Sequence, residues 1–267
     1  MNISEIDYPY YSYIPSRFGA GTFSIFVYIS LLGWFIQSLH IRCRPLALPI
    51  FLFLAHLTTF IELILRGTLY IDILNTKLLY KITARLLSLS PRLLLLANYY
   101  CLVELRGKQA RRILDRTIDI TIPIIVIIAE IFLIIADELS FDIKHYQLTF
   151  YLRQSSGGLI LSLSLIFYII WYLSIPHVRR LYILPLLAVS SACVLIEAIY
   201  IQIISIPSFF FLLKQNELWF YTGHLCPIVL ALATWSMYHP SKLLPPLEKN
   251  ISHDENDKQL LPPHSSV

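Results

Sequence analysis

The chain has 267 residues, a formal net charge of +4, and 57% hydrophobic residues. Only 14% of its residues are charged, well below the roughly 25% of a soluble domain, which excludes an ordinary soluble fold. Seven stretches are long and apolar enough to cross a bilayer, for which a helix needs ~20 mostly apolar residues. In chain order they are Phe18–Leu39, Leu46–Tyr70, Leu78–Leu105, Ile118–Asp137, Gly157–Leu173, Leu181–Ile206 and Leu218–Tyr238. We therefore expect an all-α, polytopic membrane protein with seven transmembrane helices.

The basic residues between these spans predict the orientation, because short cytoplasmic loops carry an excess of Lys and Arg. Twelve follow the first, third, fifth and seventh spans: Arg42, Arg44, Arg106, Lys108, Arg111, Arg112, Arg116, Arg179, Arg180, Lys242, Lys249 and Lys258. Six belong to the opposite side: Arg17, Lys77, Lys81, Lys144, Arg153 and Lys214. We predict an N-terminus outside and a cytoplasmic C-terminus. The net positive charge then comes from basic residues at the cytoplasmic face of the membrane, and it does not indicate nucleic-acid binding.

Three regions follow from this pattern. Residues 1–17 form a short extracellular or lumenal N-terminus, and Glu5 and Asp7 without an early Lys or Arg argue against a cleavable signal peptide. Residues 18–238 form the seven-helix transmembrane domain. Residues 239–267 are rich in Pro, Asp, Lys and Asn without an apolar period, which predicts a disordered cytoplasmic tail.

Ionisable residues within the spans are the candidates for function, because a charge at the centre of a bilayer costs roughly 2.5–3.5 kcal/mol on insertion scales. In the predicted topology most of them fall in the outer half of the membrane, and Arg92 falls near the middle. The outer set is Glu62, Arg66, Arg85, Glu130, Asp137, Glu197 and His224. Their common level predicts a polar cavity that opens towards the outer leaflet or the exoplasmic side.

Helical spacing places several of these residues together. Glu62 and Arg66 are one turn apart, in the favourable order with the acid first. Arg85 and Arg92 are seven residues apart and share a face of the third span. Glu130 and Asp137 share a face of the fourth span for the same reason. If these two faces meet, the arginines and the carboxylates neutralise each other. Arg85 and Asp137 also lie near enough to the interface to reach it. The charges are either ion pairs that hold the bundle together or parts of a binding site. His56 and His224 are either packing residues or ligands.

Several classes of function are not supported. A retinal protein needs a lysine in the seventh span for the Schiff base, and this span has none. A zinc-dependent hydrolase needs several histidine and aspartate ligands at membrane depth, and His56 and His224 alone do not provide them. A Gly-rich phosphate loop is absent, so we do not expect a nucleotide as the direct energy source. We also expect no cofactor, no metal and no enzymatic activity. Glu104-Leu105-Arg106 is only loosely like the helix-3 motif of G-protein-coupled receptors, and an Asn-Pro-x-x-Tyr motif is missing. Receptor-like signalling without the usual motifs stays open as an alternative, as does a structural or assembly role.

A set of different short motifs follows in a fixed order along residues 11–240. They are Tyr11-Ser12-Tyr13-Ile14-Pro15-Ser16, Glu62, Ser90-Pro91 with Ala97, Tyr99 and Tyr100, Gly158-Leu159, Leu181-Tyr182, Glu197, Glu217 with Tyr221, and His239-Pro240. In order and spacing the chain resembles a divergent member of the fungal lipid-translocating exporters, the RTA-like family of seven-helix proteins associated with sphingoid-base export and aminocholesterol resistance.

The chain also departs from the family pattern. The family shows Asp and Gln with a glycine run in the fourth helix, where this chain has Glu130 and Asp137 and no such run. Two arginines before the glutamate of the sixth helix are replaced by Ser190 and Val194, and the Asp of the seventh helix by His224. The resemblance therefore bears more strongly on fold than on substrate.

The resemblance implies a translocator or exporter of an amphiphilic lipid, such as a sphingoid long-chain base or another amino-lipid, with a role in resistance to toxic lipids. Its partners are then membrane lipids, and its location is the plasma membrane or a vacuolar or other endomembrane. The residues expected to bind the lipid are Glu62, Arg66, Arg92, Glu130, Asp137, Glu197, Tyr221 and His224.

The predicted orientation is testable with the chain's own glycosylation motifs. Asn2-Ile3-Ser4 lies on the predicted outer side, whereas Asn250-Ile251-Ser252 lies on the cytoplasmic side. An Asn2→Gln variant, which retains Asn250, should show no change in gel mobility on endoglycosidase treatment. A glycan at Asn250 would require the opposite topology.

Overall fold

The computed structural model describes residues 16–40, 47–68, 77–106, 113–177, 183–214 and 216–237. All the regular secondary structure of these residues is helical. Seven helical segments among them are long and apolar enough to cross a membrane, which confirms the predicted all-helical fold with seven spans. Residues 1–15, the predicted tail, Cys43 and residues 107–112 of the basic loop lie outside the described residues.

The helices follow one another with short connections. The first six spans are α1 Arg17–His40, α2 Ala47–Thr68, α3 Lys77–Leu105, α4 Ile113–Leu139, α5 Tyr146–Ser174 and α6 Ile183–Ile204. The seventh span is composite and consists of α8 Glu217–Phe220, the π-helical turn η6 Tyr221–Leu225 and α9 Cys226–Met237. Shorter elements are the 3-10 turns η4 Ile143–His145 and η5 Ile175–His177, and the helix α7 Pro207–Lys214.

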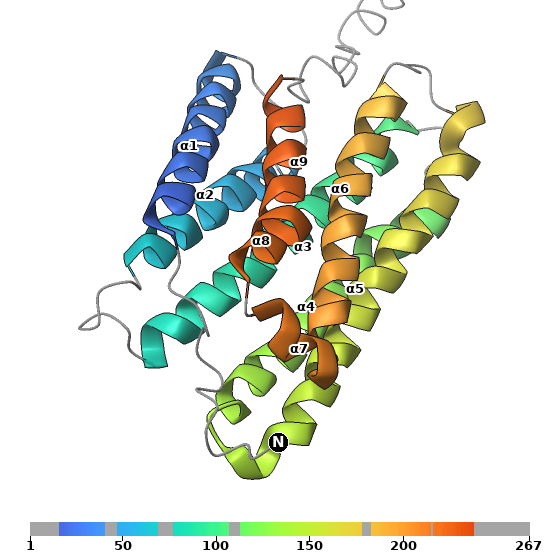
Figure 1. Ribbon diagram of the computed structural model, residues 1–267. Coiled ribbons are helices and arrows are strands. Elements are labelled where there is room, and N and C mark those ends of the chain that lie inside the picture. The colour runs from blue at the N-terminus through green and yellow to red at the C-terminus, as the bar shows by residue number, and fades with distance from the viewer. Residues whose placement is uncertain are drawn as a thin grey trace, which may run out of the picture.

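The spans form one bundle in which α3 is the central helix (Figure 1). It packs against α2, α4, α5, α6 and α9, while α1 packs against α2 and α9 at one side of the bundle. Leu94, Leu95 and Leu102 of α3 are almost fully buried for this reason. The short helix α7 lies at the lower end of the bundle in Figure 1, near the connection between α4 and α5.

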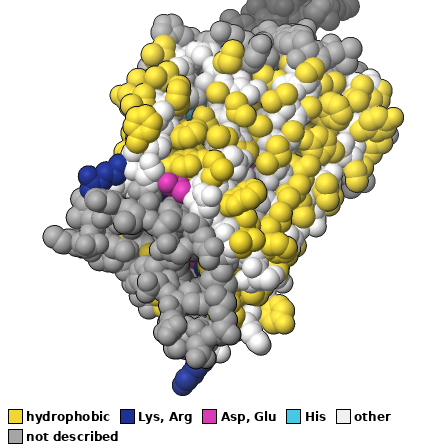
Figure 2. Space-filling view, in the orientation of Figure 1, with side chains coloured by type: hydrophobic (Ala, Val, Ile, Leu, Met, Phe, Trp, Pro, Cys, Tyr) yellow, Lys and Arg dark blue, Asp and Glu magenta, His cyan; other side chains and the backbone are white. Residues whose placement is uncertain are grey.

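The outer faces of the bundle are apolar. On α4, the exposed residues Ile120, Ile124, Ile127, Ile131 and Ile134 recur every three or four positions and so lie along one stripe of the helix. Figure 2 shows hydrophobic side chains spread over the visible face of the bundle. A helical surface of this composition suits contact with lipid rather than water.

The largest difference from the predicted boundaries concerns α5, which begins at Tyr146 instead of Gly157. Arg153 is therefore a residue of this helix, and its assignment to an outer loop was wrong. The apolar stretch appeared to start at Gly157 because Arg153, Gln154 and Ser156 lower the hydropathy of the turns before it. Thr149, Phe150 and Ser156 nevertheless continue the buried face of α5 at helical spacing.

A network of neutral polar side chains joins α3, α6 and α9. The Asn98 Nδ2 group donates to Ser191 Oγ at 3.1 Å, and its Oδ1 accepts from Ser190 Oγ at 3.0 Å and from Trp235 Nε1 at 3.2 Å. All four residues are buried. Because buried polar groups need partners, these bonds specify how the three helices face one another.

We predict that Asn98→Ala lowers the stability of the folded bundle by about 1–2 kcal/mol, because it removes hydrogen bonds that cross helices inside the membrane. The exposed Thr234 hydroxyl, which donates to Leu230 O in its own helix, provides the matched control. Thermal unfolding in detergent should show a lower midpoint for Asn98→Ala and an unchanged midpoint for Thr234→Ala. Equal midpoints for the two variants would show that the network does not hold the helices together.

Candidate functional site

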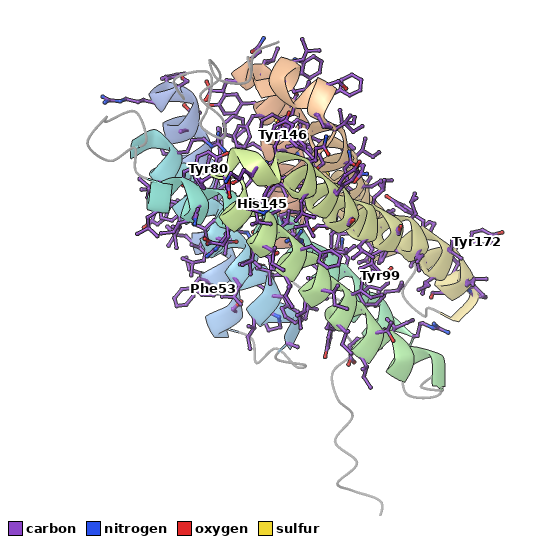
Figure 3. The ribbon with its side chains drawn as sticks, turned by 90° about the horizontal axis from the view of Figure 1, so that it is seen from below. Phe53, Tyr80, Tyr99, His145, Tyr146 and Tyr172 are labelled. Atoms are coloured by element: carbon purple, nitrogen blue, oxygen red, sulfur yellow. The ribbon has the colours of Figure 1, made fainter. Side chains whose placement is uncertain are left out.

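The ionisable residues of the spans gather towards the end of the bundle where α4 passes to α5, which we call the α4–α5 end. In Figure 3, Tyr80 and His145 lie near this end, and Tyr146 and Tyr172 mark the two ends of α5. At the connection itself, the backbone N–H of Lys144 and the ring of His145 donate to Asp142. These bonds hold the pKa of the Asp142 carboxyl below its usual range.

Glu62 and Arg66 of α2 form an ion pair, as their spacing predicts. Arg66 Nε donates to Glu62 Oε1 at 2.9 Å, and both side chains are almost completely buried. The Arg66 guanidinium also lies 3.6 Å from the centroid of the Phe220 ring of α8. A cation over an aromatic face is favoured most when both are removed from water, so Phe220 links α2 to the seventh span.

The contact continues from Phe220 to α6. The Phe220 ring stacks on the His224 ring with 5.3 Å between centroids, and His224 Nδ1 lies 3.1 Å from Glu197 Oε1. His224 and Glu197 are both buried. A continuous series of contacts, Glu62–Arg66–Phe220–His224–Glu197, therefore joins α2, α8, η6 and α6.

The position of His224 follows from the local irregularity of the seventh span. Pro227 has no backbone N–H and cannot donate to the Gly223 carbonyl as a regular helix would require. The Cys226 N–H donates to Tyr221 O, five residues back, and this is the π-helical pattern. His224 lies within this wider turn. Gly223 is needed beside it because a Cβ there would lie 2.4 Å from the Tyr200 ring.

A second set of charges surrounds Arg92, near the middle of α3. Arg92 forms an ion pair with Glu130 of α4, and its Nη2 group donates to Ser156 Oγ of α5 at 2.8 Å. Glu197 and Asp137 are near enough to interact electrostatically with Arg92. Three helices, α4, α5 and α6, thus contribute to the surroundings of one guanidinium of α3.

Asp137 and Glu138 point to different neighbours, because consecutive helical residues lie about 100° apart around the axis. Asp137 accepts from Arg153 Nη2 of α5 at 3.1 Å, and the two side chains are only 9% and 12% exposed. Glu138 pairs instead with Lys81 and Arg85 of α3 and is 53% exposed. Asp137 is therefore turned into the bundle, and Arg85 pairs with Glu138. The predicted closeness of Asp137 to the membrane interface stays a prediction.

A cavity of about 120 Å³ lies among these groups at the α4–α5 end. Its charged lining residues are Arg66, Asp137 and Arg153, and most of the rest of its wall is apolar, with contributions from Leu87, Leu133, Ile201, Ile204, Phe210, Leu213 and Phe220. Helices α2 to α8 each provide part of the lining. We call this space the large cavity.

A smaller cavity of about 20 Å³ is lined by Arg92 and Glu197 together with Pro91, Gly157 and Ile160. It has room for about one water molecule. Ser88 and Ile201 line both spaces, so the small cavity adjoins the large one. A Cβ at Gly157 would lie 2.5 Å from Gln202 Oε1, so a side chain there would require the end of the Gln202 side chain to move.

Tyr221 occupies a different place from the other predicted site residues. Its hydroxyl donates to Glu217 Oε1 at 2.8 Å and its ring stacks on Phe23 of α1. Glu217 in turn accepts the Ser16 backbone N–H at 2.9 Å. Tyr221 lines neither cavity, although it lies within electrostatic range of Arg66.

The structure brings together Glu62, Arg66, Arg92, Glu130, Asp137, Glu197 and His224 as partners in pairs around the two cavities. Sequence reasoning missed Arg153, Phe220 and Ser156. The apolar residues Leu148, Phe150, Tyr151 and Leu152 before Gly157 are the sequence signal that would have extended the fifth span to include Arg153 and Ser156. The four-residue step to His224 would have revealed Phe220. His56 is a packing residue, with Nδ1 donating to Leu52 O at 2.7 Å and Nε2 facing Ser30 and Ser236.

Among the described residues, no group of three His, Cys, Asp or Glu side chains is arranged to hold a metal ion. Comparisons with protein-family models, with curated proteins and with solved structures found no match. The resemblance to lipid-translocating exporters therefore rests on the sequence motifs alone.

The Arg92–Glu130 pair provides a test of how the buried charges stabilise the bundle. Arg92→Met should lower the free energy of unfolding by about 3 kcal/mol, because Glu130 then keeps its charge without its partner. The double variant Arg92→Met/Glu130→Met should be more stable than the single variant, since no unpaired charge is left. Denaturant unfolding in detergent measures both values.

The exposed pair Arg85–Glu138 is the control, and its disruption by Arg85→Met should change the same quantity by no more than about 1 kcal/mol. A double variant as unstable as Arg92→Met would indicate that Arg92 acts through packing and through Ser156 rather than through its charge.

Proposed function

We propose that this multi-pass membrane protein is a translocator that moves an amphiphilic lipid across or out of the bilayer. The observation that carries the proposal is the large cavity, because it combines apolar walls with charged groups inside a bundle whose outer surface is itself apolar. Ligand sites commonly have this composition, with a few polar groups that fix orientation. A lipid has the matching two parts, a chain and a polar head.

The orientation predicted from the basic residues adds a direction to this proposal. With the N-terminus outside and the C-terminus in the cytoplasm, the α4–α5 end faces the exoplasmic side. The large cavity then lies beneath the outer headgroups, where a lipid leaving the membrane would be released. The protein would act in the plasma membrane or in a vacuolar or other endomembrane.

The charged residues have two roles in this proposal. Arg66 and Asp137 contact the lipid directly, since they line the large cavity. Glu197 and Arg92 line the small cavity, and with Glu130 and His224 they provide polar contacts deeper in the bundle. Glu62 holds Arg66 in place. The resemblance favours a long-chain base or another amino-lipid, since it is to a family of sphingoid-base exporters.

The signalling alternative depends on the basic segment from Arg106 to Arg116. The part from residue 107 to 112 lies outside the described residues, and no described contact favours that alternative. The alternative predicts that a cytosolic partner engages this segment, whereas a translocator needs no partner to move lipid.

The direct test is reconstitution of the purified full-length chain into vesicles, followed by measurement of the movement of labelled single-chain amphiphiles with amine, zwitterionic or acidic heads. We expect at least one of these lipids to move faster than in protein-free vesicles. Absence of movement for all of them would overturn the proposed function.

Within the same assay, Glu197→Gln should reduce the rate by about tenfold or more, a loss of at least about 1.4 kcal/mol. The substitution keeps the shape of the side chain but removes the charge that faces His224 and the small cavity. Glu138→Gln, at an exposed acid of the same end, should retain the wild-type rate. Full transport by Glu197→Gln would exclude Glu197 from the site while leaving the function intact. In cells, Glu197→Gln should also lose protection against toxic amphiphilic amines at unchanged expression.

A further inference from the structure

The charges that line the large cavity are unequal in number. Two of them are guanidinium groups, Arg66 and Arg153, and one is the Asp137 carboxylate. The formal charge of the lining is therefore +1, although the wall around it is mostly apolar. Such a wall makes each charge more effective than it would be in water.

The two guanidinium groups differ in how they meet the cavity. Arg66 is fully buried between Glu62 and the Phe220 ring, which fix its position. Arg153 is 12% exposed, bonds to Asp137 and lies 5.9 Å from the Phe210 ring centroid. Arg153 is thus the more accessible cation, whereas the charge of Arg66 is balanced by Glu62, which lies behind the cavity wall.

The glutamates that would suit an amine are placed elsewhere. Glu62, Glu130 and Glu197 do not line the large cavity, and each is already paired, with Arg66, Arg92 and His224 respectively. Glu197 does line the small cavity, but the room there for about one water molecule does not accommodate an alkyl ammonium with its chain. Asp137 is thus the one carboxylate among the residues that line the large cavity, against two guanidinium groups, so an acidic head finds more groups of opposite charge there than an amine head does.

We propose that the large cavity binds a single-chain amphiphile with an acidic head, a carboxylate or a phosphate, and that Arg153 is the residue that recognises this head. Guanidinium groups match the planar geometry of a carboxylate and the oxygens of a phosphate. Leu87, Leu133, Ile201, Ile204 and Leu213 provide the apolar wall for the chain. The inference rests on the proposed lipid-handling function and specifies its substrate class, in contrast to the amine that the resemblance favours.

The test uses the purified full-length protein in nanodiscs and a photo-crosslinking fatty acid as probe. Unlabelled competitors share one alkyl chain and differ only in the head: carboxylate, phosphate, amine or alcohol. We expect the carboxylate or the phosphate to displace the probe with at least about tenfold higher affinity than the amine or the alcohol. Comparison of the two acidic competitors shows whether the cavity prefers a carboxylate or a phosphate head. Crosslinked residues should lie on α3, α4, α6 and α7, which provide the apolar wall of the cavity.

Variants test the role of Arg153 separately. The double variant Arg153→Gln/Asp137→Asn removes both members of the ion pair, and it should weaken binding of the acidic probe by about tenfold. Arg153→Lys retains the positive charge and should retain a larger share of the affinity. The matched control Arg85→Gln/Glu138→Gln alters a pair at the same end that does not line the cavity, and its affinity should stay within about twofold of wild type.

Two results would overturn the inference: an amine that competes as well as the acids, or a folded Arg153→Gln/Asp137→Asn variant with wild-type affinity for the acidic probe. The comparison of heads uses the unaltered protein, so it decides the ligand class even where a variant does not fold. Acid binding without lipid movement in vesicles would reject the translocator and keep the site. Movement of an amine without acid binding would reject this inference and keep the translocator.

Discussion

The need to pair every ionisable group inside an apolar bundle determines much of the arrangement of this protein. Arg92 meets Glu130 and Ser156, Arg66 meets Glu62 and Phe220, and Asp137 meets Arg153. Most of these contacts cross from one helix to another, so the charges also fix which helix faces are neighbours. A side chain that lost its partner would be left with an uncompensated charge in an environment that solvates it poorly.

These pairs do not fill the interior completely, and this distinguishes the α4–α5 end from the rest of the bundle. Around Asn98 the polar groups bond directly to one another across α3, α6 and α9. Around Arg153 and Arg92 the charged groups border two adjoining cavities with Ser88 and Ile201 between them. The bonds around Asn98 specify how the helices pack. The cavities beside Arg153 and Arg92 leave room for a molecule to enter, and the proposed function is assigned to them for that reason.

The sequence was sufficient for the number of spans and for the pairing of Glu62 with Arg66, because apolar length and helical spacing are local properties. It was insufficient for the partners of Asp137 and Arg85, which depend on how α3, α4 and α5 are rotated about their axes. Arg153 was missed because a hydropathy criterion ends a span at a polar turn, although the partner that stabilises this turn lies on another helix. Asn98 and Phe220 carry no charge, so a search for ionisable groups passed over both.

The π-helical turn at Tyr221–Leu225 has a consequence for the register of the seventh span. Such a turn accommodates one residue more than a regular helix, which displaces the residues before it by about 100° around the axis relative to those after it. The span can thereby present Phe220 to Arg66 at one level and Trp235 to Asn98 at another. A chain that lacked one residue in this turn would have to give up one of these two contacts.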